Sequence, residues 1–142
     1  MSAPSTGPRS LRIAAAVAAV VVIATIGWLV WPSSPDSVVL KAGTPQHLVT
    51  VTIDSLRLGD TAVDVTVTDR TGAAIDHAAV QVQAIQPLMG HAGAPVAAAA
   101  TGSGHFRAAS VSLMMTGPWE LRLFIDAHHG SDQVTLPLWV GG

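Results

Sequence analysis

Two hydrophobic patterns divide this chain of 142 residues. Residues 13–31 form a run of nineteen positions without a charged side chain, whereas apolar and polar residues alternate from Val38 onward. A long continuous apolar run is typical of a membrane-spanning segment, and alternation is typical of strands with one buried face. We therefore predict an apolar N-terminal segment followed by one β-rich domain.

The apolar run has the length and the flanking residues of a membrane anchor. As a helix, its nineteen residues would reach roughly 28 Å, close to the thickness of the hydrocarbon core of a bilayer. Arg9 and Arg12 precede the run, while Trp28 and Trp31 lie at its far end. Basic residues favour the cytoplasmic side and tryptophans favour the interface. These flanks predict that the rest of the chain is extracytoplasmic.

The resulting domain organisation has four parts. We predict a cytoplasmic tail over residues 1–12, a transmembrane helix over 13–31, a stiff linker over 32–37 and a folded domain over 38–142. The protein would then be a single-pass protein of the cell membrane with its C-terminal domain outside the cytoplasm. A cleaved signal peptide is the alternative, but the run is long for one and no small-x-small cleavage site follows it.

Alternation within residues 38–142 predicts about seven short strands. The clearest runs from Trp119 to Ile125, where apolar residues alternate with mostly charged ones. The strand after the His128-His129-Gly130-Ser131 turn is expected at a sheet edge, because Pro137 has no N–H to donate. Short strands at this spacing, without an amphipathic helix, are typical of an all-β, antiparallel two-sheet sandwich.

Two further details of the pairing can be predicted. Residues 47–53 and 63–67 are expected to form a hairpin, with Gly59-Asp60 as its turn. Residues 106–115 change phase, because Phe106 and the residues from Val111 onward have apolar positions of opposite parity. An extra residue near 108–110 would restore one buried face, so we predict a β-bulge there.

Composition and charge exclude several classes of function. The chain has no cysteine, which removes disulfides, thiolate metal sites and thiol nucleophiles. Its net charge is -2, and the Lys and Arg residues do not cluster, so it lacks the basic stripe that nucleic-acid binding requires. No Gly-x-Ser-x-Gly, phosphate-binding glycine loop or His-Glu-x-x-His motif is present, so we expect no enzymatic activity.

Four short motifs resemble the YtkA-like domain family, to which FixH-like proteins are related. They are Gly72-Ala73-Ala74-Ile75-Asp76-His77-Ala78-Ala79-Val80, Pro87-Leu88-Met89-Gly90-His91, Gly104-His105-Phe106 and Met115-Thr116-Gly117-Pro118-Trp119-Glu120-Leu121. The resemblance covers roughly residues 40–140. It implies an immunoglobulin-like, membrane-attached extracytoplasmic sandwich of a kind often found alongside copper-handling proteins of the CopC type.

The resemblance also assigns residues. It places the family's Met/His loop on Met89 and His91, and its Gly-x-Trp corner on Gly117 and Trp119. This chain departs from the family pattern at Phe106, where an aromatic hydroxyl is common. That difference removes a role for a tyrosine there and leaves the expected fold unchanged.

Met89 and His91 are also the candidate metal ligands on chemical grounds. If residues 88–92 are extended, side chains two apart point the same way. Thioether sulfur suits Cu(I) and imidazole nitrogen suits Cu(II), so copper is the predicted metal, with His105 and Met114 as further ligands. The alternative is that Met89 fills the core and His91 is solvated in a loop.

The remaining methionine, tryptophan and histidine candidates have structural interpretations. Met115 shares parity with Leu113 and is expected in the core. Trp119 is expected to be buried, with its indole N–H hydrogen-bonded. The other histidines, His47, His77 and the adjacent His128 and His129, are read as structural, solvated or turn residues.

Two functions therefore follow from the sequence. The first is a membrane-anchored extracytoplasmic domain that binds copper or assists its delivery, in company with a copper-handling protein. The second is a metal-free module that docks on a protein partner of the cell envelope through the same loop.

Overall fold

The computed structural model describes residues 36–142. The predicted tail, the predicted transmembrane helix and most of the predicted linker lie outside the described residues. Within 36–142, no helix is long and apolar enough to cross a bilayer. The elements are β1 Val38–Gly43, β2 His47–Ile53, β3 Gly59–Asp69, β4 Ala78–Gln86, the 3₁₀ turn η1 Pro87–Met89, β5 His91–Ala92, β6 Val96–Gly102, β7 His105–Leu113, β8 Gly117–Ala127 and β9 Gly130–Val140.

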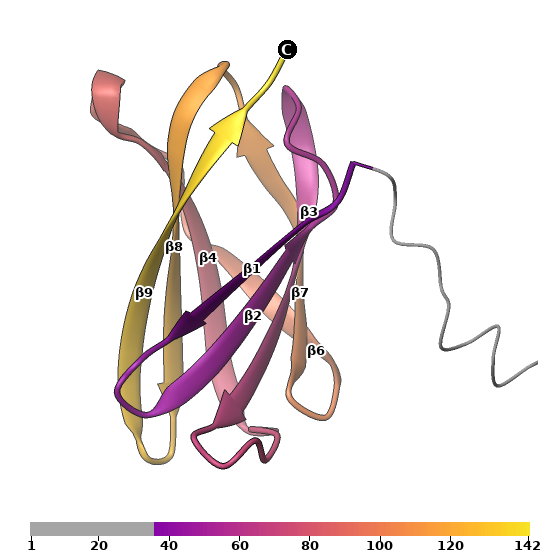
Figure 1. Ribbon diagram of the computed structural model, residues 1–142, viewed down its shortest axis with the longest axis vertical. Helices are drawn as coiled ribbons and strands as arrows, with labels where there is room; N and C mark the ends of the chain where they lie inside the picture. The colour runs from indigo at the N-terminus through magenta and orange to yellow at the C-terminus, as the bar shows by residue number, and fades with distance from the viewer. Residues whose placement is uncertain (1–35) are drawn as a thin grey trace, which may run out of the picture. The chain divides into compact units, whose positions relative to one another are not determined.

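All strands pair antiparallel in one continuous hydrogen-bonded path (Figure 1). The order is β1-β2-β3-β7-β6-β4-β8-β9, and the two-residue β5 pairs with β4. The all-β antiparallel prediction is confirmed. The predicted number of about seven strands is corrected to nine in the described residues, and the two predicted sheets are joined, because β6 changes partner along its length. Its first half pairs with β4 and its second half with β7, which joins the two layers.

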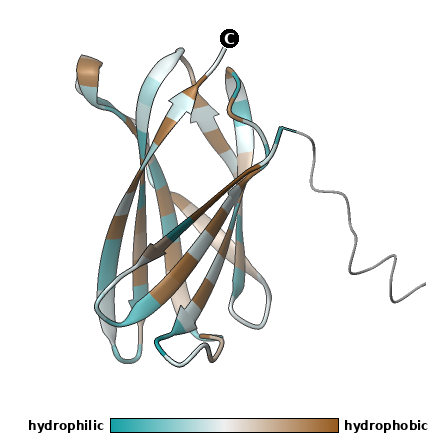
Figure 2. Ribbon diagram, in the orientation of Figure 1, coloured by the Kyte–Doolittle hydropathy of each residue, from teal (hydrophilic) through white to brown (hydrophobic). Residues whose placement is uncertain are grey.

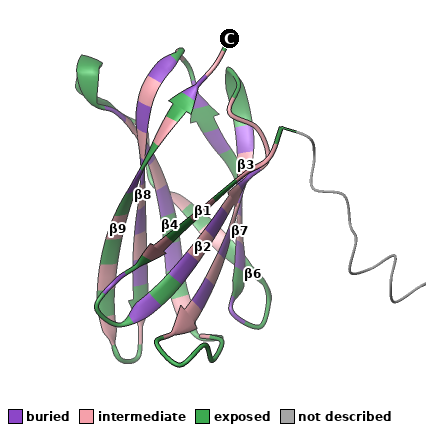
Figure 3. Ribbon diagram, in the orientation of Figure 1, coloured by how far each residue is buried: buried purple, intermediate pink, exposed green. Residues whose placement is uncertain are grey.

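The core lies between the layers and follows the alternation of the sequence. In β8 every second residue from Gly117 to Ile125 is buried, and the same alternation marks β2, β3 and β4 (Figure 3). Most buried hydrophobic side chains are valine, leucine and isoleucine. Branched side chains of this kind pack well on a pleated surface. Trp119 is also buried, and its indole N–H donates to the carbonyl of Met115 at 2.9 Å, as predicted.

The predicted β-bulge lies in β7. Thr61 of β3 pairs with Val111, whereas Val63, two residues on, pairs with Ala108. The extra residue falls at positions 109–110, which are exposed, while Ala108 and Val111 are both buried. The bulge therefore keeps the apolar residues of both halves of β7 in the core.

The predicted hairpin of β2 and β3 is confirmed, but its turn is corrected. Gly59 and Asp60 belong to β3, because this strand continues past the end of β2 and pairs there with β7. Residues 54–58 make the connection instead. At the other margin of the sheet, β9 is an edge strand, as the proline at position 137 predicts.

Candidate functional site

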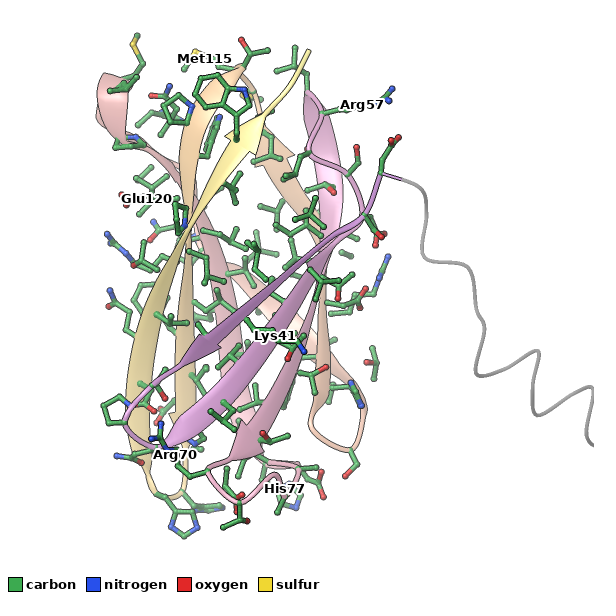
Figure 4. All side chains as sticks on the ribbon, viewed as in Figure 1. Lys41, Arg57, Arg70, His77, Met115 and Glu120 are labelled. Carbon is green, nitrogen blue, oxygen red and sulfur yellow. The ribbon has the colours of Figure 1, made fainter. Side chains whose placement is uncertain are left out.

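The strand order gives the domain two ends of different character. We call one the methionine end; it comprises η1, residues 54–58, the 114–116 turn and the C-terminal part of β9. We call the other the clamped end; it comprises the 44–46 turn, residues 70–77, the 103–104 turn and the 128–129 turn. Figure 4 places Met115 toward the first end and His77 toward the second.

The loop that carries Met89 and His91 is folded rather than extended. Residues 87–89 form a 3₁₀ turn, in which the Met89 N–H donates to the side-chain oxygen of Gln86 at 2.8 Å. Gly90 then adopts a left-handed conformation with φ 62. The two ligand candidates are thus separated by a reversal of the chain. The expectation that strand geometry aligns their side chains is wrong, because the Pro87 turn and Gly90 interrupt the strand.

Both candidate methionines are nevertheless accessible to solvent. Met89 is 68% exposed and Met114 is 73% exposed, so Met89 is not a core residue. His91 is also exposed. Met115 is half-buried and packs against the core, which agrees with its parity. Contacts between η1 and β8 place the Met89 turn at the same end of the domain as the 114–116 turn, which leads into β8.

His105 lies at the opposite end. It begins β7, pairs with Thr66, and its ring Nδ1 lies 3.0 Å from the Thr66 hydroxyl. Met114 follows the other end of the same strand. Met114 lies nine positions after His105 along the strand, which corresponds to roughly 30 Å at about 3.3 Å per residue. The prediction that His105 helps to bind the same metal as Met114 is therefore corrected.

The donors at the methionine end define what kind of metal could bind there. In the described range 36–142, no group of three or more His, Asp or Glu side chains is placed to hold an ion. A site at this end would depend on the two thioethers with His91. That donor set suits Cu(I) and is a poor match for Mg²⁺ or Ca²⁺, which prefer oxygen ligands.

The methionine end is also apolar. The turn η1 is strongly hydrophobic in Figure 2 and exposed in Figure 3. Seven large hydrophobic side chains are exposed in the described domain, and five of them lie at this end: Leu58, Leu88, Met89, Met114 and Trp139. Exposed apolar residues usually scatter singly, so this concentration distinguishes the methionine end from the rest of the described surface.

The clamped end contains a buried polar network that sequence reasoning missed. His47 Nδ1 lies 2.7 Å from the carboxylate of Asp132, and their side chains are only 2% and 7% exposed. The Thr44 hydroxyl and the Gln46 N–H also donate to this carboxylate. The network fastens the β1–β2 turn to β9, the edge strand at the other end of the hydrogen-bonded path.

This network sets the ionisation of Asp132. Burial alone raises the pKa of its carboxyl and is the largest single effect. The hydrogen bonds from residues 44–47 together outweigh burial, so the pKa of Asp132 lies below its usual value. The carboxylate is therefore a stable structural anchor. Its 85-residue separation from His47 leaves no local signal of the pairing in the sequence.

A second histidine grouping lies nearby on the surface. His77, Asp126 and His128 line one shallow depression at the clamped end. Ala79 of β4 pairs with Asp126 of β8, which brings the two strand ends together. The Asp126 carboxylate is already bonded by the Ser131 hydroxyl at 2.8 Å. We assign these residues no binding role.

The fold and the exposed loop define a small antiparallel β domain with a Met/His end. The family model described as YtkA-like matches residues 43–124, which is more than half of the chain, and the chain belongs to this family. All four predicted ligands lie within the matched range. No curated protein and no solved structure matched the chain.

Proposed function

We propose that this YtkA-like protein is anchored in the cell membrane through residues 13–31 and binds Cu(I) at its methionine end for transfer to another copper-handling protein. The observation that carries the proposal is the exposure of Met89 and Met114, at 68% and 73%, at the same end of the domain. Methionine is more often buried than exposed, so two exposed thioethers at one end of the domain are notable.

The surroundings of the two thioethers support exchange rather than storage. Both lie in turns that project from the sheet, and His91 offers an imidazole beside the Met89 turn. Open, solvent-facing donors leave coordination positions free for ligands from a partner. The described residues carry five basic and nine acidic side chains, giving 5 − 9 = −4, a balance that favours a cation.

The decisive measurement is a Cu(I) titration of the full chain in detergent, in competition with a chromogenic chelator. We expect one site, with Met89→Leu, His91→Ala and Met114→Leu each lowering the affinity by about tenfold or more, because even the outer partners of metal ligands contribute that much. Leucine keeps the volume of methionine, so these substitutions test sulfur rather than shape.

His105→Ala is the matched control, because it removes an exposed imidazole at the clamped end. We expect it to bind Cu(I) as tightly as the parent chain. Equal binding by all four variants, or no site tighter than micromolar, would contradict the proposal.

A second candidate function is a metal-free module that docks on an envelope protein. The apolar neighbours of the thioethers favour it, since Leu58, Leu88 and Trp139 are exposed but cannot bind a metal. The same variants separate the two functions. Loss of a co-purifying partner without any change in Cu(I) affinity would support docking.

A further inference from the structure

The exposed apolar residues of the methionine end come from separate segments that converge. The pairing of Gly59 with Leu113 places the preceding Leu58 next to the following Met114. Trp139 pairs with the second residue of β8, and the start of β8 also belongs to the end where η1 lies. The five side chains therefore project from four separate segments, since Leu88 and Met89 share η1.

The polypeptide enters the domain at this same end. Val38, the first residue of β1, pairs with Ile53, the last residue of β2. Just before it, the Asp36 carboxylate lies 3.3 Å from the guanidinium of Arg57, which neighbours Leu58. Only residues 32–35 separate Asp36 from the end of the uncharged run at Trp31. Five peptide units span at most about 18 Å.

We propose that the methionine end rests on the lipid surface and inserts its apolar side chains into the headgroup region. The inference uses the membrane anchoring of the proposed function and does not depend on copper. An anchor in residues 13–31 would hold the domain's point of entry within about 18 Å of the bilayer. Tryptophan and leucine are the residues that favour this interface.

The origin of the exposed side chains in separate segments favours lipid over a second protein. Side chains that project from four separate segments suit a fluid interface, which adapts to them, better than a protein partner, whose face must be complementary in shape. Arg57 is 69% exposed beside Leu58, and a lipid phosphate would compete with Asp36 for its guanidinium. The exposed residues of the clamped end are instead largely polar: Asp76, His77, Ser103, Asp126, His128 and His129.

The absence of native cysteine makes a direct test possible. In the full chain reconstituted in lipid nanodiscs, spin labels would be attached at Leu88→Cys and, separately, Met114→Cys. The matched control is Ser103→Cys, which is also exposed but lies in the turn of the clamped end. The measurement is the ratio of collisions with oxygen, which enriches in lipid, to collisions with a water-soluble nickel chelate.

We expect this ratio at Leu88 and Met114 to exceed that at Ser103 by about twofold or more, since interfacial side chains lie roughly 5–10 Å into the headgroup and acyl boundary. Equal ratios at the three positions would overturn the proposal. Dipolar broadening between labels of two chains, without a gain in oxygen collisions, would overturn it in favour of a second copy.

Different results would contradict the proposed membrane anchor and the proposed contact with lipid. A chain that separates from the nanodiscs on a sizing column would overturn both the anchoring and the docking. A chain that stays with the nanodiscs but shows equal label ratios would overturn the docking alone. Copper affinity measured on the parent chain is independent of both results.

Discussion

The two ends of this domain share one core but differ in which side chains they bury and which they expose. At the clamped end, a buried carboxylate gathers donors from the β1–β2 turn and fixes it to β9. At the methionine end, thioether and apolar side chains project into solvent, and η1 buries no residue. The clamped end is held by buried hydrogen bonds, whereas the methionine end exposes its apolar side chains.

The contrast shows where the molecule tolerates change. Removing any member of a buried polar network lowers the free energy of unfolding, because the remaining groups are left without partners. Exposed apolar side chains contribute little to folding, so selection for a partner can keep them. Substitutions at the two ends should therefore affect different measurements.

The largest expected effect is at the clamp. Asp132→Ala should lower the free energy of unfolding by about 3 kcal/mol or more, because it leaves buried donors of His47 and Thr44 unpaired. Urea unfolding followed by circular dichroism measures this loss. Asp126→Ala is the control on the same hairpin. Within residues 36–142 its exposed carboxylate accepts a side-chain hydrogen bond only from Ser131, so we expect a loss below about 1 kcal/mol. Similar losses for the two variants would show that the buried network around Asp132 does not contribute special stability.

Low pH should also lower the stability of the domain, because it protonates Asp132. The pKa of Asp132 is lower in the folded state than the value of about 3.9 for an unfolded aspartate. Its contribution to stability is then fully present above that value and is lost as the pH falls through the folded pKa. Unfolding measured between about pH 5 and 2 should show a shallower acid slope in Asp132→Asn than in the parent chain. Parallel slopes would show that other carboxylates govern acid unfolding.

Two glycines offer a smaller, matched comparison of the ends. Both have positive φ, 67 for Gly104 and 62 for Gly90, so alanine is strained by about 1 kcal/mol at either position. At Gly104 a Cβ would also meet the carbonyl oxygen of Val67 at 2.8 Å, whereas at Gly90 it would meet nothing within 4 Å. We expect thermal unfolding to show Gly104→Ala as clearly the more destabilised variant. An equal loss of stability in the two variants would show that the backbone around Gly104 shifts to accommodate the added Cβ.

The smallest effect on folding is expected from the exposed thioethers. Met89→Leu and Met114→Leu should change the free energy of unfolding by no more than about 0.5 kcal/mol, because both side chains are largely solvated. Chemical denaturation measures this. A loss well beyond that range would mean that these residues stabilise the domain, and would weaken the argument that they are kept for binding.

Much of the fold could be predicted from alternation alone. The strand around Trp119 and the bulge in β7 follow from residue parity, because burial of one face makes the period of two visible. The edge position of β9 follows from Pro137, which has no N–H to donate. The prediction of a turn at Gly59-Asp60 was wrong, because β3 extends beyond the end of β2 and pairs there with β7. The length of a strand depends on which other strands pair with it, and the residue types within the strand do not indicate this.

The candidate site was less predictable than its scaffold. Met114 was correctly placed off the buried parity. For Met89 both a ligand and a core interpretation were open, and the structure leaves its side chain exposed. Their mutual arrangement could not be inferred, because the extended geometry assumed for residues 88–92 is replaced by a 3₁₀ turn. His105 was grouped with them by its position across a turn, although strand β7 carries the chain to the other end.

The sequence by itself therefore determined the all-β class, most strand positions and the YtkA-like membership, since each depends on local residue patterns. Tertiary structure decided that β6 joins the two layers, that His47 meets Asp132, and that His105 and Met114 lie at opposite ends. These features join residues far apart in the chain. Pairing of distant strands brings them together or apart, and no local pattern encodes that choice.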